Sequence, residues 1–173
     1  DLPMGEEKYF IYADLTGSGI STSHLDSLQG KRIGVLSGSI QEVQLQQWMD
    51  KQQIPMQMVP LTSLKDTRDK LANHVIDCVA SVEVPVWGDM GFSKVVMFGK
   101  SDNFFVVNKN RPDLKVSLDA AMRQIDQDKP FYADDLYKQY FATTGAAVFT
   151  KDEQDWLHWH GTVRLGYLAD DAG

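Results

Sequence analysis

The chain has 173 residues, of which 43% are hydrophobic and 24% are charged. This composition can fill the core of one ordinary domain and excludes a disordered segment. The formal net charge of −7 argues against nucleic acid or an anionic membrane surface as a partner. The single cysteine, Cys78, cannot form an internal disulfide, and no apolar run approaches the roughly 18 residues of a membrane span.

The first element that the sequence predicts is a strand over residues 8–13, where aromatic and branched side chains gather in Lys-Tyr-Phe-Ile-Tyr-Ala. Residues 14–23 contain several glycines and serines and therefore predict a loop. A brief helical turn is expected over residues 24–28.

The segment that organises the rest of the chain begins with residues 32–36, which are apolar, too short for a helix and therefore predict a buried strand. Ser37, Gly38 and Ser39 then turn the chain. Ser39 is a good N-cap, and Glu42 completes a capping box, so a helix should begin here. Together these elements direct free backbone N–H groups and the positive end of a helix dipole to one spot, which would suit a small polar or anionic group.

The helix after this turn is expected to bury a stripe made by Ile40, Val43 and Trp48. Strands and helices then alternate: a strand over 54–60, a helix over 63–73, a strand over 75–81, a short helix or irregular loop over 83–91, and strands over 94–98 and 103–108. This alternation predicts an α/β fold with a mostly parallel sheet of about five strands flanked by helices. Ligands of such sheets bind outside the carboxyl ends of the strands, where residues 37–39 and 81–83 both lie.

The periodicity becomes helical from Pro112 onward. An apolar stripe predicts a helix over 113–128, and a second helix is expected over 130–144. Thr150 and Glu153 form another capping box, which should open a short helix that ends at Gly161. Residues 162–168 predict a last strand.

Three stretches carry a resemblance to a known family. LDSLQGKRIGVLSGSIQEVQL (25–45) resembles the opening of the second lobe in the family 3 extracellular solute-binding proteins, which have the type II periplasmic binding fold. FFVVNKNRPDLKVSLDAAMRQI (104–125) resembles the strand and helix that return to the first lobe. FTKDEQDWLHWHGTVRLGYL (149–168) resembles the junction between tandem solute-binding domains in bacterial sensor histidine kinases and in diguanylate cyclase or phosphodiesterase receptors.

The resemblance implies a division of the chain into four parts. Residues 1–14 would be a crossing strand from a truncated first lobe, 15–107 a second lobe, 108–145 the return helices of the first lobe, and 146–173 the junction helix and first strand of a following repeat. The expected partners are therefore a small polar solute, the missing first lobe and the following repeat. The return helices would lack native packing, which leaves a homo-oligomer through exposed helices possible.

The resemblance also implies a ligand site. Ligand contacts are expected from the turn and helix start at Ser37, Gly38, Ser39 and Ile40. The family's acidic residue for the ligand amino group should fall near Ser81, where this chain has no acid, and Glu83 two residues later could substitute. Asp77 is expected to be a structural hydrogen-bonding residue. The clamp arginine of amino-acid binders belongs to a first-lobe segment that has no counterpart here.

The sequence carries no recognisable catalytic motif, so no catalytic residue, metal or cofactor is expected. His158 and His160 are two residues apart on a helix and should face different directions, which disfavours chelation. The function expected from the resemblance is an extracytoplasmic sensor module of a membrane-anchored bacterial receptor. Three alternatives stay open: the freestanding binding protein of an ABC transporter, an enzyme on the same fold, and a structural spacer that binds nothing.

Overall fold

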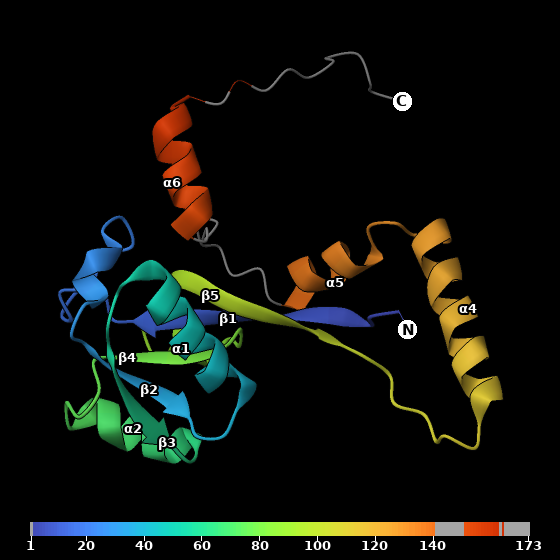
Figure 1. The fold of residues 1–173 in the computed structure, drawn as a ribbon, viewed down its shortest axis with the longest axis horizontal. Helices are drawn as coiled ribbons and strands as arrows, with labels where there is room; N and C mark the ends of the chain where they lie inside the picture. Colours follow the sequence, from blue (N-terminus) through green and yellow to red (C-terminus); the bar gives the residue numbers. More distant parts are fainter. Residues whose placement is uncertain (1, 141–150, 163, 165–173) are drawn as a thin grey trace.

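The computed structural model describes residues 2–140, 151–162 and 164. Its centre is a five-stranded sheet in the order β3-β2-β4-β1-β5 (Figure 1). Strand β2 is parallel to both β3 and β4, whereas β1 is antiparallel to its neighbours β4 and β5, so four strands share one direction. The predicted α/β class and strand number are confirmed. The strands are β1 (Gly5–Ala13), β2 (Arg32–Leu36), β3 (Gln57–Leu61), β4 (Cys78–Val82) and β5 (Ser93–Asn103).

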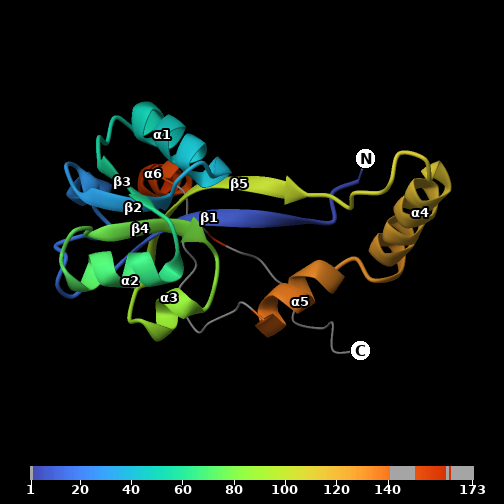
Figure 2. The same ribbon diagram turned by 90° about the horizontal axis from the view of Figure 1, so that it is seen from below.

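Helices cover both faces of the sheet, with α1 on one face and α2 and α3 on the other (Figure 2). Alternate residues of the strands supply a core to each face, as the twofold period of a strand requires. On β1, Tyr9 and Ile11 pack under α1, whereas Phe10 and Tyr12 pack toward α3. The covering elements are η1 (Leu25–Leu28), α1 (Ile40–Gln52), α2 (Leu64–Ala72) and α3 (Val86–Asp89).

The buried face of α1 differs from the predicted stripe. Leu45, Trp48 and Met49 are buried, whereas Ile40 and Val43 are 51% and 53% exposed. The three buried positions follow the i, i+3, i+4 spacing of one helix face, and this face lies against the sheet. Ile40 and Val43 lie in the first turn, beside the edge of the sheet where the chain emerges from β2. The prediction was correct for Trp48 and wrong for the other two.

The strand boundaries also shift. Strands β3 and β4 begin about three residues later than the sequence indicated, and Pro60 lies within β3, where an edge strand tolerates a missing donor. Residues 104–108 are not part of a strand, so the second of the two strands predicted over 94–98 and 103–108 is wrong, and the first extends over Ser93–Asn103 as the single strand β5. Its residues pair with β1 from Ser93 to Asn103, and Gly99 does not interrupt the pairing.

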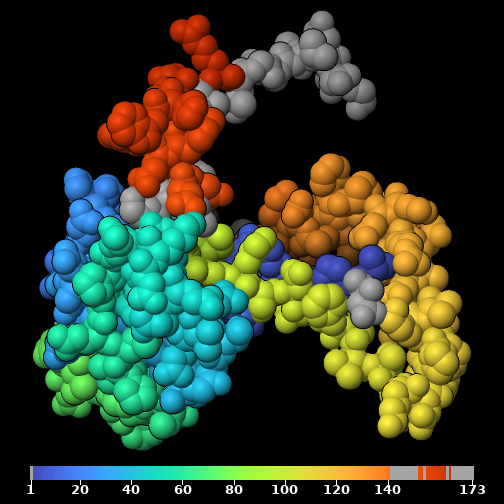
Figure 3. Space-filling model, in the orientation of Figure 1, coloured from blue at the N-terminus to red at the C-terminus, as the bar shows by residue number. Residues whose placement is uncertain are grey.

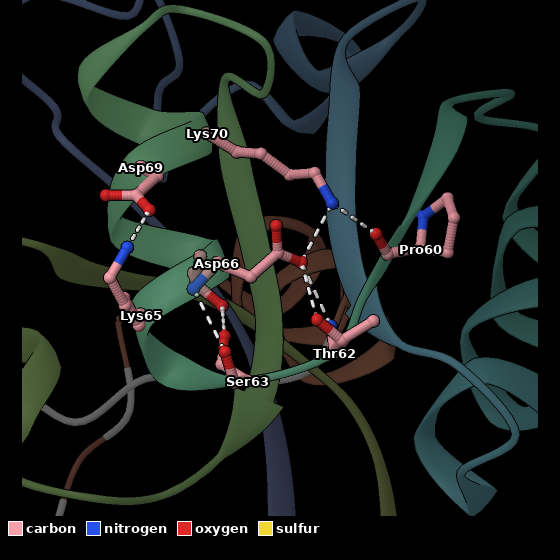
Figure 4. A network of polar contacts seen from close by, with 8 residues as sticks. Pro60, Thr62, Ser63, Lys65, Asp66, Asp69 and Lys70 are labelled. Atoms are coloured by element: carbon pink, nitrogen blue, oxygen red, sulfur yellow. Dashed lines mark hydrogen bonds and ion pairs between the residues drawn. The ribbon is translucent and has the colours of Figure 1, made fainter.

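The start of α2 was predicted correctly, and its polar contacts show why (Figure 4). The Ser63 hydroxyl accepts the N–H of Asp66 at 3.1 Å. The Asp66 carboxylate in turn accepts the N–H of Thr62 at 3.0 Å and the Lys70 ammonium at 2.8 Å. One of the N–H groups that a helix start leaves unpaired, that of Asp66, is thus satisfied locally, as is the N–H just before the cap.

Beyond the sheet the chain forms α4 (Pro112–Asp128), α5 (Tyr132–Tyr140) and α6 (Lys151–His160). Helices α4 and α5 lie at the far end of the two-stranded ribbon that β1 and β5 make, and neither helix has a buried residue (Figures 1 and 3). Helix α6 lies near α1, where Lys51 forms an ion pair with Asp152 at 2.8 Å. No helix within the described residues has the length and apolar character to cross a membrane.

Some predictions lie outside the described residues. These are the N-cap at Thr150, the end of the second helix near Gly145, and most of the strand over 162–168. Thr162 and Arg164 are described and are not part of a strand. Gly161 has a φ of +66° directly after α6, which confirms it as the glycine that ends that helix.

Candidate ligand-binding edge of the sheet

The turn after β2 and the segment after β4 lie at the same edge of the sheet. Ile33 pairs with Cys78 and Gly34 with Val79 in parallel register, so the carboxyl ends of both strands reach the edge side by side. The structure therefore brings the two predicted groups, 37–40 and 81–83, to neighbouring strand ends. The first group opens α1 and the second leads into α3.

The backbone amides of the turn are less free than the sequence indicated. The Ser37 N–H donates to a carbonyl at the end of β3 at 3.1 Å, and the Ser39 N–H donates to the last carbonyl of β2 at 3.3 Å. The Gly38 N–H donates to a carboxylate oxygen of Glu42 at 2.7 Å. The sequence predicted several free N–H groups at the turn and helix start, and these three are not among them, because the chain satisfies them itself.

The predicted capping box at the start of α1 is present. The Ser39 hydroxyl accepts the Glu42 N–H at 3.2 Å and donates to the Leu36 carbonyl at 2.7 Å. Gly38 has a φ of +73°, a conformation that favours glycine and lets the turn close tightly. The amides of Ile40 and Gln41 are the ones that helix geometry leaves for an outside acceptor. A polar group could meet those amides and the Ser37 hydroxyl, but an anion would also meet the Glu42 carboxylate.

The Glu83 side chain is largely enclosed, with 10% of it exposed. One of its carboxylate oxygens forms an ion pair with the Lys94 ammonium and accepts the Tyr137 hydroxyl at 2.6 Å. Burial and this hydrogen bond raise the pKa of Tyr137, so the phenol stays protonated and donates. Burial, followed by the charge of Glu83, likewise raises the pKa of Tyr12.

Two partners of Glu83 were missed from the sequence. Lys94 enters from β5, and its ammonium also lies 4.7 Å from the centroid of the Phe10 ring. Tyr137 enters from α5, and the Lys8 ammonium lies 5.3 Å from the centroid of its ring. No local pattern could have found Tyr137, because it is 54 residues from Glu83 along the chain.

Ser81 and Asp77 take different places on β4. Ser81 is half-buried and opposite Phe10 in the antiparallel pair with β1. Asp77 lies at the other end of β4, where its carboxylate bonds to Arg32 at 2.6 Å. The structural role predicted for Asp77 is confirmed.

Within residues 2–140, 151–162 and 164, no three His, Cys, Asp or Glu side chains gather in a way that could hold a metal ion. The Nδ1 atom of His160 lies 2.8 Å from the Trp156 carbonyl, and the two rings stack with centroids 4.1 Å apart. Burial raises the pKa of the Cys78 thiol to about 12, which leaves it without nucleophilic character.

No family model matches the chain, and no curated protein sequence is similar to it. Solved structures are similar. A probable amino-acid ABC transporter extracellular-binding protein from Bacillus subtilis has a TM-score of 0.68 at 17% identity, over 84% of this chain and 64% of that one. An amino acid ABC transporter substrate-binding protein from Streptococcus pneumoniae, bound to L-arginine, has a TM-score of 0.55 at 17% identity, over 83% and 62%.

An ancestral amino-acid-binding protein, a precursor of cyclohexadienyl dehydratase, has a TM-score of 0.57 at 14% identity, over 81% of this chain and 60% of that one. The chain thus spans less than two thirds of the length of each of these three proteins. At these identities the similarity establishes the fold alone. The chain has the fold of a lobe of a type II periplasmic binding protein, with additional helices.

Proposed function

We propose that this chain is the second lobe of an extracytoplasmic solute-binding module of a membrane-anchored bacterial receptor. A small polar or anionic solute would bind at the edge formed by the carboxyl ends of β2 and β4, between this lobe and a first lobe. Closure of the two lobes would carry the signal. The observation that supports this most is the meeting of both predicted ligand-binding segments at one edge of a sheet of this fold.

The charges at the edge of the sheet favour ligand contact at residues 37–40 over contact at Glu83. Glu83 is already paired with Lys94 and Tyr137, so an ammonium group would have to displace a lysine to reach it. Ligand contact at Ser37, Ser39 and the amide of Ile40 costs less, because those groups lie at the exposed start of α1. We therefore propose that the ligand contacts the turn and the helix start directly. Ser81 and Glu83 would line the adjoining wall of the site.

The proposed first lobe has a surface to pack on. Phe104, Phe105 and Val106 are 49%, 51% and 95% exposed, and neither α4 nor α5 has a buried residue. A mostly apolar cavity of about 510 Å³ lies between the segment after β5 and α4. Its walls are Leu2, Phe104, Phe105, Val106, Val107, Lys115, Leu118, Asp119 and Met122. Apolar surface of this extent favours a protein partner over solvent, and a second copy of the chain is the alternative occupant.

A second function is favoured by the similar structures themselves. The proteins from Bacillus subtilis and Streptococcus pneumoniae are named as ABC transporter binding proteins. The alternative is therefore a freestanding transporter component. A parent gene that encodes membrane spans and a cytoplasmic signalling domain supports the receptor, and a gene that ends soon after this segment supports the transporter.

The experiment that tests solute binding is calorimetry on the full-length protein with a panel of L-amino acids and small mono- and dicarboxylic acids. At least one solute should bind, and Ser39→Asp should weaken an anionic one. This variant keeps a capping oxygen but adds a negative charge beside the Ile40 amide. Gln47→Asp, on an exposed part of the same helix, is the control. Failure of every solute to bind would refute the proposal and favour the structural spacer.

A further inference from the structure

We infer that Gln44 is a positioning residue for the two-stranded ribbon that joins the sheet to α4 and α5. Its side-chain amide would fix the point at which β1 and β5 leave the sheet, and so would set the angle between the sheet and these two helices. The inference goes beyond the proposed function and does not need a ligand to be tested.

The ribbon changes character at one position. From Tyr9 to Tyr12, strand β1 is flanked on both sides, by β4 and by β5. The Lys8 carbonyl still accepts the Glu83 N–H at 3.1 Å, and from Glu7 outward to Gly5 the strand pairs with β5 alone, opposite Ser101 to Asn103. An isolated pair of strands is only marginally stable and bends easily. The transition from three strands to two therefore lies opposite Gly99 and Lys100, and a bend of the ribbon should be concentrated there.

Gln44 of α1 contacts this position. Its Nε2 atom donates to the Lys100 carbonyl at 3.0 Å, and its Oε1 atom accepts the Lys100 N–H at 3.0 Å. Both main-chain groups of Lys100 face outward, along the edge of the sheet that has no further strand. The side chain thus occupies the place of one residue of a missing neighbour strand. Two such bonds hold the strand against α1 where the flank provided by β4 ends.

Gly99 makes room for this contact. A Cβ atom built on Gly99 would lie 2.0 Å from Gln44 Oε1 and 3.1 Å from its Cδ, so any side chain there would push the amide away. The pairing of β1 and β5 also shifts register between Tyr9 and Phe10, which pair with Gly99 and Met97. Such a bulge increases the local twist of a strand pair. The bulge, Gly99 and the two bonds between Gln44 and Lys100 all lie where the β4–β1–β5 part of the sheet ends.

The test measures the ribbon directly in the 173-residue chain. Spin labels at Arg68→Cys on α2 and Arg123→Cys on α4, both exposed positions, would report the distance between the sheet and the distal helices by pulsed electron paramagnetic resonance. Buried Cys78 should not react with the label. The original chain should give one narrow distance distribution, and Gln44→Ala should broaden or shift it.

Amide exchange provides the second readout. Exchange at the Lys100 N–H should become about tenfold faster in Gln44→Ala, because this amide loses the Gln44 side-chain acceptor. Gly99→Ala should have the same effect, because the added Cβ atom displaces the Gln44 side chain although the glutamine itself is retained. Gln46→Ala is the matched control, since Gln46 lies on the same helix and bonds only to Asp50 there.

A distance distribution that stays unchanged in both Gln44→Ala and Gly99→Ala would overturn the inference, even if the Lys100 amide exchanged faster. Equal broadening in Gln46→Ala would overturn it too, because the effect would then come from α1 in general. Failure of solute binding leaves these measurements untouched, so the two proposals fail separately.

Discussion

Asp77 and Arg32 form a two-pronged contact at the amino ends of β4 and β2. The guanidinium Nη2 lies 2.6 Å from Asp77 Oδ1, and Nε lies 3.0 Å from Oδ2. The main-chain N–H of Arg32 donates to the same Oδ2 at 2.8 Å, and the Asp77 N–H donates to the Arg32 carbonyl. The contact fixes the alignment of two central parallel strands at the end opposite the candidate site.

This contact predicts a dependence of stability on pH. The hydrogen bonds from Arg32 hold the pKa of Asp77 below its ordinary value of 3.8. A carboxyl with a lower pKa in the folded chain stabilises the fold above the unfolded pKa, and this contribution is lost as the pH falls through the folded pKa. Asp77→Asn should therefore lower the urea midpoint at about pH 6 and reduce the difference in midpoint between about pH 6 and about pH 3.

The control for Asp77 is Asp113→Asn. Asp113 forms a comparable pair with Arg111 at 2.7 Å, but at the exposed start of α4. Exposed pairs contribute little because water screens them, so this variant should shift the midpoint less. A larger shift for Asp113 than for Asp77 would contradict the structural role assigned to the Asp77–Arg32 pair.

Gly34 in the middle of β2 predicts a steric effect. A Cβ atom there would lie 2.8 Å from Ile76 Cδ1 and 2.9 Å from Leu61 Cδ1, both in the tightly packed core on the α3 face. Gly34→Ala should destabilise the chain by about 1–3 kcal/mol, the usual cost of overpacking. Thermal and urea unfolding followed by tryptophan fluorescence would measure it.

Gly88 in α3 is the matched control for Gly34. A Cβ atom on Gly88 has no heavy atom within 4 Å, and its φ is not positive. Gly88→Ala should be neutral or stabilise by about 0.4–1 kcal/mol, because alanine has less freedom to lose on folding. If both variants lost the same stability, crowding at Gly34 would not be the cause.

Two variants of Ser39 test its role in helix capping separately from its proposed ligand contact. Ser39→Ala removes the oxygen that accepts the Glu42 N–H and should cost about 1 kcal/mol of folding free energy. Ser39→Asp retains a capping acceptor and should stay within about 0.5 kcal/mol of the original chain. Urea titration of both variants would check this. Equal losses in the two variants would show that the lost stability does not come from the capping acceptor.

Local patterns predicted what local chemistry controls. The helix starts at Ser39 and Ser63 were visible from residue spacing, because each N-cap bond is completed within four residues. The alternation of strands and helices predicted an α/β sheet for the same reason. The site residues after β2 and β4 were placed at one edge from the parallel arrangement alone, and the register of Gly34 with Val79 agrees with this.

Contacts between distant segments were not predictable in this way. The sequence indicated a break in the strand at Gly99, yet pairing with β1 and the bonds from Gln44 keep β5 continuous there. It gave Glu83 no partner, yet Lys94 and Tyr137 both reach it.

The sequence by itself determined the α/β class of this protein, the alternation of its strands and helices and the starts of α1 and α2, because turns, caps and hydrophobic periods act over a few residues. Only the tertiary structure decided which face of α1 is buried, how far β5 extends, and which charges meet at the candidate edge. Those outcomes depend on packing and pairing between segments that lie tens of residues apart, and no short stretch of sequence contains that information.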